Sequence, residues 1–420
     1  MEATTAKVVD QDFALDHVAQ GSKKGFFSML VVMLGFTFFS ASMWAGGKLG
    51  AGVTFNDFFL SVLAGNLILG LYTGALAYIA ASTGLSTHLL ARYSFGAKGS
   101  YLPSFLLSFT QVGWFGVGVA MFAIPIAKAT GWNVYALIII GGLLMTSSAW
   151  FGIKALTILS FIAVPAIAVL GCYSVTDAIG TFGFDALQSV TPIHEMSLFA
   201  AIGICVGSFI SGGTLTPDFT RFAKTKKVAV STTVIAFFLG NTLMFIFGAV
   251  GAALYQLNDI SDVLVKQGMI VLGMVVLGLN IWTTNDNALY ASGLGLSNVT
   301  GLPKKWVVIF NGIIGTIFAM WLYNNFVGWL STLNVMLPSI GAVIIADFFV
   351  VNKGKYLSMA QMKTDQVNGF KAIRIPALLA WGIGVAVALL TEHGFIGGIT
   401  PLNATIVSLI VYPILVKLIK

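Results

Sequence analysis

Two stretches of this chain place serine and glycine inside long apolar runs: FFSASMWAGG at residues 38–47 and SFISGG at residues 208–213. Serine and glycine weaken a helix, and non-helical backbone at membrane depth is tolerated only where it is buried in protein or lines a cavity. Each stretch therefore predicts a membrane helix that is interrupted near its middle. Another interpretation is that both are ordinary small-residue packing faces between helices.

The composition around these stretches is that of a membrane protein. Of the 420 residues, 57% are hydrophobic and 9% are charged, and the mean hydropathy is +0.93. A soluble domain carries roughly a quarter charged residues, so a soluble fold is excluded. Apolar runs of about 20 residues predict an all-α membrane protein with about 12 transmembrane helices. Their cores lie near 26–47, 57–81, 101–127, 133–152, 154–174, 196–216, 228–254, 268–292, 305–323, 326–350, 372–391 and 400–418.

The interrupted helices are the first and the sixth of these runs, so they enter the membrane from opposite sides. Two five-helix halves of opposite orientation predict an inverted repeat with a binding site at the membrane midplane, which is typical of secondary transporters. We expect a tail at 1–25, a transport core at 26–350 and, at 351–420, a loop with two additional helices. Within the core, the first repeat spans 26–174 and the second spans 196–350.

The basic residues are distributed unequally between the two sides of the predicted topology. With a cytoplasmic N-terminus, 19 of the 22 lysines and arginines lie in cytoplasmic segments, and only Lys48, Lys128 and Lys266 lie outside. This bias follows the positive-inside rule and predicts that both termini are cytoplasmic. The net charge of +7 is thereby explained by topology, and no nucleic-acid partner is expected.

The eighth predicted helix carries an unusually polar run, LNIWTTNDN at 279–287. Asn280, Thr283, Thr284 and Asn287 follow the spacing i, i+3, i+4, i+7 and share one helix face. Two hydroxyls and a nearby carbonyl are hard oxygen ligands suited to a small alkali cation, and carbonyls freed by a broken first helix would complete its shell. Alternatively, both threonines only bond to carbonyls of their own helix.

Asp286 is the only acid placed well inside a predicted span. Acids at membrane depth are costly and usually functional, so Asp286 is a candidate proton carrier. Its position toward the cytoplasmic end of the helix is also compatible with a water-filled vestibule or with a loop lysine as partner.

The third predicted helix offers an amide and an aromatic ring on one face, at Gln111 and Trp114. A second ring, Phe209, lies in the interrupted sixth helix. Two aromatic faces can stack on a planar ring, and a carboxamide can donate and accept hydrogen bonds in the plane of that ring. These residues predict a site for a small, neutral, planar solute.

Long strings of this sequence resemble the nucleobase:cation symporter-1 family. They are FTFFSASMW at 36–44, THLLARYSFGAKGS at 87–100, TQVGWFGVGVAMFAIP at 110–125, GSFISGGTLTPDFTRF at 207–222, GLNIWTTNDNALYASGLG at 278–295 and LYNNFVGWL at 322–330. The resemblance extends from the first span to near the last. It implies the leucine-transporter-type fold of five plus five inverted helices with two more at the C-terminus, in a bacterial inner membrane.

The resemblance also implies sodium-driven uptake of cytosine and assigns residues to it. Cytosine is expected to stack between Trp114 and Phe209 and to bond with Gln111, Ser208, Ser211 and Asn280 or Asn285. Sodium is expected to bind the carbonyls of Phe39, Ser42 and Asn280 and the hydroxyls of Thr283 and Thr284. No organic cofactor is implied, and a monomer in the lipid bilayer is expected.

The rival functions are a membrane-embedded enzyme, a proton-coupled symporter and a passive channel, which would not accumulate solute against a gradient. A membrane-embedded enzyme is not expected, because the sequence has neither HExxH nor GxSxG, and it lacks the GxxxxGK[ST] loop of an ATP-driven pump. A proton-coupled symporter of a related nucleobase or a hydantoin, with Asp286 as the proton carrier, remains the alternative.

Overall fold

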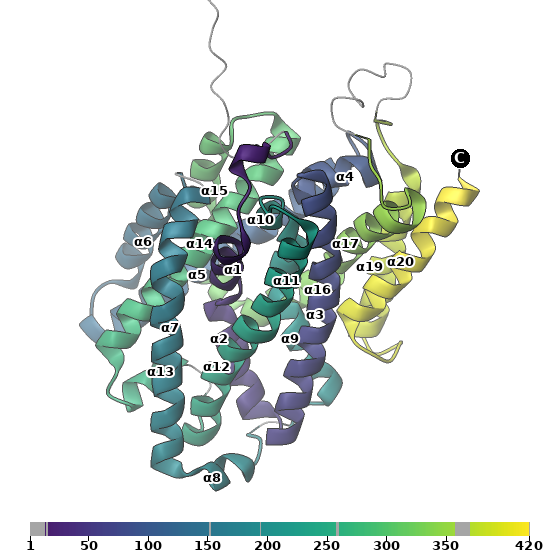
Figure 1. The fold of residues 1–420 in the computed structure, drawn as a ribbon. Coiled ribbons are helices and arrows are strands. Elements are labelled where there is room, and N and C mark those ends of the chain that lie inside the picture. Colours follow the sequence, from purple (N-terminus) through teal and green to yellow (C-terminus); the bar gives the residue numbers. More distant parts are fainter. Residues whose placement is uncertain are drawn as a thin grey trace, which may run out of the picture.

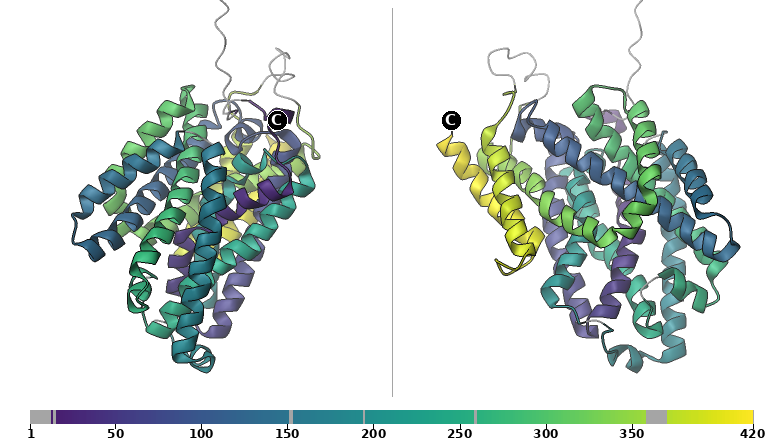
Figure 2. Two further views of the ribbon diagram at one scale, coloured as in Figure 1. Left: turned by 60° about the vertical axis from the view of Figure 1, so that its left-hand side comes forward. Right: turned by 180° about the vertical axis from the view of Figure 1, so that it is seen from behind.

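The computed structural model describes residue 13 and residues 16–150, 153–193, 195–257, 260–357 and 370–419. The described chain folds into helices packed side by side in one bundle (Figures 1 and 2). The first helical turn, Gln20–Ser22, and the C-terminal end lie at the same end of the bundle in Figure 1.

The helices of the first half are long and mostly apolar. They are α1 (Phe26–Thr37), α2 (Ser40–Gly52), α3 (Phe55–Thr83), α4 (Thr87–Phe95), α5 (Tyr101–Thr130), α6 (Val134–Ala149), α7 (Ile153–Phe182) and the short α8 (Phe184–Gln188).

The second half of the chain continues into two C-terminal helices. Its elements are α9 (Leu198–Thr214), α10 (Thr216–Thr220), α11 (Lys226–Ile235), the π-helical turn η2 (Ala236–Asn241), α12 (Thr242–Tyr255), α13 (Ile260–Lys266), α14 (Ile270–Thr300) and α15 (Lys304–Asn324). These are followed by α16 (Phe326–Met336), α17 (Pro338–Ala346), the π-helical turn η3 (Asp347–Val351), α19 (Ile375–Glu392) and α20 (Thr400–Leu418).

Among the described residues, eight helical segments are long and apolar enough to cross a membrane, and the bent pair α1–α2 makes nine. The shorter apolar helices α6 and α9 and the 31-residue α14 pack in the same bundle. The predicted all-α membrane fold is therefore confirmed, while the count of about 12 spans stays a prediction.

The predicted interruption of the first span is present. Helix α1 ends at Thr37, α2 begins at Ser40, and the two are bent by 51°. Phe38 has φ −74° and ψ 70° and Phe39 has φ −106° and ψ 123°, so neither residue is helical. The backbone groups freed here lie inside the protein, as a break at membrane depth requires.

The predicted interruption of the sixth span at 208–213 is wrong in its position. Helix α9 runs unbroken through these residues, and the break falls at Leu215, between α9 and α10. The ring of Pro217 would meet the carbonyl of Gly213 in a continuous helix, which explains the new position. Gly213 has a packing role instead, because a Cβ at this position would lie 3.1 Å from the Thr73 side chain of α3.

Glycines also bring α2 and α12 into backbone contact. A Cβ on Gly46 would lie 2.3 Å from the Phe245 carbonyl oxygen, and one on Gly50 would lie 2.4 Å from that of Ala249. From the other side, a Cβ on Gly248 would lie 1.8 Å from the Met43 carbonyl oxygen. The glycine-rich part of the first stretch thus serves close helix packing, which is the second of the two interpretations.

One buried carboxylate connects the C-terminal helices to the core. Asp347 Oδ1 accepts hydrogen bonds from Tyr412 Oη of α20 at 2.6 Å and from Arg374 Nη1 at 3.1 Å. Its Oδ2 accepts from Tyr356 Oη at 2.6 Å. The Tyr356 ring in turn stacks on Tyr93 of α4, with centroids 4.3 Å apart. Four separate segments of the chain therefore meet at Asp347.

Candidate functional site

A pocket lies where the α1–α2 break meets α5, α9 and α14. Its walls come from both halves of the chain, as expected of a site between two repeats. The lining residues are Phe36, Phe39, Gln111, Trp114, Ser208, Phe209, Gly212, Thr284, Asn285, Asn287 and Ala288. All of the polar side chains among them are at least nine-tenths buried.

Four aromatic rings form one part of this pocket. Trp114 of α5 and Phe209 of α9 are both buried, and the ring of Phe39 contacts both of them edge-on. The centroid of the Phe39 ring lies 5.0 Å from that of Trp114 and 5.9 Å from that of Phe209. The ring of Phe36 contacts Phe209 edge-on as well, with centroids 5.0 Å apart. The structure thus brings together the two predicted stacking residues and adds two rings, from the end of α1 and from the break.

The amide of Gln111 is held by a short chain of hydroxyls. Gln111 Nε2 donates to Ser211 Oγ at 2.8 Å, and Ser211 Oγ lies 2.9 Å from Thr110 Oγ1. Ser211 supports Gln111 from behind and is not among the residues that line the pocket. Ser208 does line it, and its hydroxyl donates to the Cys205 carbonyl at 3.0 Å within α9.

The two asparagines predicted to bind substrate occupy different places. Asn285 lines the pocket, and its Nδ2 donates to the Phe115 carbonyl at 3.2 Å. Asn280 does not line it, because its side chain spans the break between α1 and α2. There Asn280 Nδ2 donates to the Phe38 carbonyl and Asn280 Oδ1 accepts from Ser40 Oγ, both at 2.5 Å.

The residues of the predicted cation site cluster around the same break. Thr283 Oγ1 donates to the Leu279 carbonyl at 3.0 Å, and Thr284 Oγ1 donates to the Asn280 carbonyl at 3.2 Å. These bonds are those of the alternative interpretation, in which the threonines bond within α14. Because a hydroxyl oxygen has two lone pairs, each threonine oxygen can still coordinate a cation while its hydrogen is donated to a carbonyl.

On the opposite side of the predicted cation site, one carbonyl at the start of α2 and one side chain of α2 both have hydrogen-bond partners. The Phe39 carbonyl accepts the Ser42 N–H at 2.9 Å, as expected at the start of a helix. Ser42 Oγ donates to Asn241 Oδ1 at 2.7 Å. Asn241 lies at the end of η2, so a π-helical turn of the seventh span reaches toward the break.

Asp286 points away from the pocket, toward α6. Its Oδ1 accepts from Ser148 Oγ at 2.7 Å, and Ser148 Oγ accepts from Trp282 Nε1 at 2.6 Å. The side chain has no exposed surface, which contradicts a position facing a water-filled vestibule. Its Oδ2 has no hydrogen-bond partner among the described residues.

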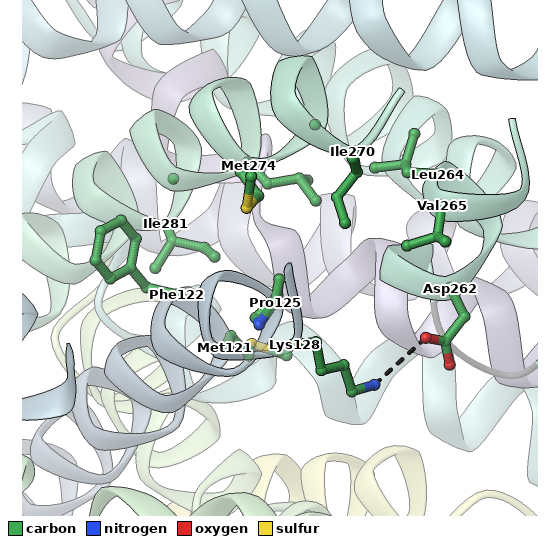
Figure 3. Close-up of a pocket in the computed structure, with 13 residues that line it drawn as sticks. Met121, Phe122, Pro125, Lys128, Asp262, Leu264, Val265, Ile270, Met274 and Ile281 are labelled. Carbon is green, nitrogen blue, oxygen red and sulfur yellow. Dashed lines mark hydrogen bonds and ion pairs between the residues drawn. The ribbon is translucent and has the colours of Figure 1, made fainter. Parts of the chain in front are cut away.

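A second pocket, shown in Figure 3, lies between α5, α13 and α14. It is lined mainly by aliphatic side chains, Phe122 and methionines, and at its edge Lys128 Nζ lies 3.3 Å from Asp262 Oδ1. Both charged side chains are about half exposed. This pocket has one aromatic ring and no amide, so it lacks the groups that a planar polar solute requires.

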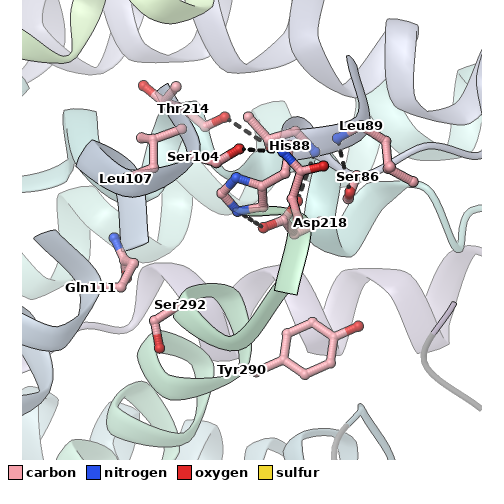
Figure 4. A network of polar contacts seen from close by, with 12 residues as sticks. Ser86, His88, Leu89, Ser104, Leu107, Gln111, Thr214, Asp218, Tyr290 and Ser292 are labelled. Carbon is pink, nitrogen blue, oxygen red and sulfur yellow. Dashed lines mark hydrogen bonds and ion pairs between the residues drawn. The ribbon is translucent and has the colours of Figure 1, made fainter. Parts of the chain in front are cut away.

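A polar cluster that the sequence analysis did not identify lies at the end of the bundle that holds α4 and α10 (Figures 1 and 4). His88 Nε2 of α4 lies 3.7 Å from Asp218 Oδ2 of α10, and both side chains are buried. Asp218 Oδ1 accepts the Thr87 N–H at 2.8 Å. Arg221 Nε donates to the Asp218 carbonyl at 3.1 Å, and Arg221 Nη2 donates to Tyr290 Oη of α14 at 3.2 Å.

Burial dominates the electrostatics of this cluster. It lowers the pKa of His88, and the neighbouring Asp218 carboxylate opposes that shift only in part. Burial likewise raises the pKa of Asp218 against the opposing charges of His88 and Arg221. His88 and Asp218 lie in two of the strings that resemble the symporter family, and this was the one signal that could have identified them.

The comparisons with known proteins agree with this architecture. Residues 18–415 match the family described as permease for cytosine/purines, uracil, thiamine, allantoin. The chain is 55% identical over 407 residues to the cytosine permease of Escherichia coli (strain K12), covering 97% of this chain and 94% of that protein. It is 25% identical to the hydantoin permease of Microbacterium maritypicum, covering 73% of this chain and 69% of that protein.

Solved structures show the same fold. Mhp1, a nucleobase-cation-symport-1 family transporter in a closed conformation with bromovinylhydantoin bound, superposes with a TM-score of 0.82 at 20% identity and covers 96% of this chain and 94% of its own. A Na+-coupled sialic acid symporter in a substrate-bound outward-open state has a TM-score of 0.70 at 14% identity, with coverage of 99% and 93%.

Fold and pocket together define an integral membrane transporter of the leucine-transporter type rather than an enzyme. The chain belongs to the family of permeases for cytosine/purines, uracil, thiamine and allantoin, and its predicted membership of the nucleobase:cation symporter-1 group is confirmed.

Proposed function

We propose that this chain imports cytosine together with sodium by alternating access. The observation that carries the proposal is the pocket at the α1–α2 break, where the buried rings of Trp114 and Phe209 and the amide of Gln111 meet. A flat heterocycle stacks on such rings and exchanges in-plane hydrogen bonds with a carboxamide. The 55% identity to a protein described as a cytosine permease supports this choice of base.

Sodium is proposed as the coupling ion because the break and helix α14 together carry uncharged oxygens beside the pocket. These are the hydroxyls of Thr283 and Thr284 and the carbonyls of Phe39, Ser42 and Asn280. Among the described residues no group of three acidic, histidine or cysteine side chains is placed to hold a metal ion, as a divalent metal site would need. Unwound backbone and hydroxyl oxygens are the usual ligands of sodium in transporters of this architecture.

Substrate binding is proposed to involve Gln111, Ser208 and Asn285 directly. Ser211 positions Gln111, and Asn280 acts through the backbone of the break, as its side-chain bonds suggest. A monomer is proposed as the working unit. The proposed orientation places both termini in the cytoplasm of a bacterium, with the transport core at 26–350 in the inner membrane.

The energetics of this scheme are adequate for accumulation. One sodium ion that enters down about 100 mV releases roughly 2.3 kcal/mol, and a tenfold sodium gradient adds about 1.4 kcal/mol. Each 1.4 kcal/mol supports roughly a tenfold concentration ratio. Together the two terms therefore support several-hundred-fold accumulation of a neutral base inside the cell.

Uptake of radiolabelled cytosine into proteoliposomes tests the proposal. We expect accumulation with an inward sodium gradient and none when choline replaces sodium at constant pH. Uptake that persists in choline and follows a proton gradient would instead favour Asp286 as a proton carrier, whose Oδ2 has no partner among the described residues. Failure to accumulate cytosine under either gradient would refute cytosine as the substrate.

The cation site has its own prediction. Replacing both Thr283 and Thr284 by alanine removes two cation ligands, and we expect the sodium stimulation of uptake to disappear. The matched control is Thr176→Ala, because Thr176 makes the same bond to an i−4 carbonyl on an exposed face of α7. Sodium-stimulated uptake in the double variant would place the cation elsewhere.

A further inference from the structure

Asn287 brings a buried donor without a partner to the pocket. Its side chain is 5% exposed and lines the pocket, and its Nδ2 has no hydrogen-bond partner among the described residues. Buried donors in folded proteins are nearly always paired, since an unpaired donor costs about as much as a lost hydrogen bond. An unpaired donor that faces a binding pocket is therefore expected to meet an acceptor on the ligand.

The other polar side chains of the pocket differ from Asn287 in this respect. Gln111 Nε2 donates to Ser211 Oγ, and Asn285 Nδ2 donates to the Phe115 carbonyl. The hydroxyls of Ser208 and Thr284 donate to carbonyls of their own helices. The hydroxyls have one hydrogen each, and Asn285 Nδ2 also donates to Met145 Sδ at 3.1 Å, so these three groups have no donor left for a ligand. Gln111 Nε2 keeps one N–H, and Asn287 Nδ2 keeps both.

Asn287 also has a favourable position along α14. It lies three residues after Thr284 and seven after Asn280, so it shares their helix face about one turn farther on. A base held against Trp114 and Phe209 is bordered on this side by α14, because Thr284, Asn285, Asn287 and Ala288 all line the pocket.

We infer that Asn287 is a specificity-determining residue whose amide N–H donates a hydrogen bond to an acceptor on the edge of the bound base. The inference rests on the proposed function. Cytosine presents adjacent acceptors, the ring nitrogen N3 and the carbonyl oxygen O2. Uracil keeps O2 but carries a hydrogen on N3, so a donor directed at N3 favours cytosine over uracil, and N3 is the acceptor that we assign to Asn287.

Two variants of Asn287 test this role, with Asn311→Leu as the matched control. Asn287→Leu removes the donor without breaking a hydrogen bond donated within the protein. Asn287→Asp has the same size and replaces the amide donor by a carboxyl oxygen. Asn311 is also a buried asparagine, but it donates to Ser292 Oγ at 2.8 Å and does not line the pocket.

The measurements are the Kd values of cytosine and uracil for the purified full-length protein and the melting temperature of each variant. We expect Asn287→Leu to lose about 10- to 100-fold in cytosine affinity and to melt no lower than the parent protein. The ratio of cytosine to uracil affinity should fall about tenfold in Asn287→Asp. Asn311→Leu should keep the parent affinity and melt at a lower temperature.

The inference is overturned if the parent protein binds cytosine and Asn287→Leu binds it within twofold. Should Asn287→Leu not fold, an unchanged affinity ratio in Asn287→Asp overturns it equally. A parent protein that binds neither base refutes the proposed function itself, which is a separate result.

Discussion

At the scale of single residues, Trp114 is the side chain on which the pocket most depends. It is buried, it lines the pocket together with Phe209, its ring contacts that of Phe39 edge-on, and it stands one helical turn from Gln111. Its contribution is contact area with a ring, because stacking of a base on an aromatic side chain is worth about 1–3 kcal/mol.

Trp114→Ala should therefore weaken cytosine binding by about 5- to 150-fold. Trp114→Phe, which keeps an aromatic face, should lose much less. Isothermal titration of the purified variants measures both effects. Trp132→Ala is the control, since Trp132 is 66% exposed and lies outside the pocket. If Trp114→Ala binds cytosine as tightly as the parent protein, stacking on Trp114 does not contribute to binding.

His88 gives a prediction for how the stability of the folded protein depends on pH. Burial lowers its pKa in the folded protein, so the folded state favours neutral imidazole, whereas the unfolded chain protonates near pH 6.5. Stability is therefore retained above about pH 6.5 and falls as the pH drops below that value, by at most about 1.4 kcal/mol per pH unit. Melting temperatures between pH 7.5 and 5.5 should decrease less in His88→Gln than in the parent. An equal decrease in both would exclude His88 as the source.

At the scale of helices, the backbone contact between α2 and α12 depends on residues without a side chain. A methyl group on Gly46 would overlap the Phe245 carbonyl, and neither backbone can yield without moving its helix. Overpacking of this kind typically costs about 1–3 kcal/mol.

Gly46→Ala should accordingly lower the melting temperature of the detergent-solubilised protein. Gly203→Ala is the matched control, because Gly203 is also helical but a Cβ there would meet nothing within 4 Å. That variant should be neutral or stabilised by up to about 1 kcal/mol through helix propensity. Equal melting of Gly46→Ala and the parent would contradict the close approach of α2 and α12.

The two interruptions illustrate what the sequence predicts and what it does not. The break at Phe38 and Phe39 was predictable from local composition, since serine and glycine follow an apolar run. The sixth helix contains the same residue types, yet its glycines contact neighbouring helices and Pro217 moves the break to Leu215. Likewise, the position of Asn280 follows from partners about 240 residues earlier, at Phe38 and Ser40, and no local pattern encodes that contact.

At the scale of the whole molecule, Asp347 decides how the C-terminal helices are attached. Its carboxylate has no exposed surface and receives bonds from Tyr356, Arg374 and Tyr412, which belong to three other segments. Backbone bonds from Ala97 to Lys371 and from Lys98 to Ala372 add a second attachment beside α4. The pair α19–α20 is thus fixed to the core by polar contacts as well as by packing.

Asp347→Asn should destabilise the protein by about 3–5 kcal/mol, because Arg374 loses its charge partner in a largely buried setting. Limited proteolysis should then cut between η3 and α19 faster than in the parent. The control is Asp262→Asn, which breaks a half-exposed pair with Lys128 that is worth at most about 1 kcal/mol. Similar proteolysis of the two variants would show that packing alone holds α19 and α20.

The two hydrogen bonds of the Asn280 amide have a consequence for the rate of conformational change. From α14 the amide bonds to both sides of the bend between α1 and α2, through one bond to a carbonyl and one to a hydroxyl. A displacement of α14 relative to this bend has to break both bonds. The proposed cation would bind the carbonyl of the adjacent residue, Phe39, so we expect its binding to be coupled to the breaking of these two bonds.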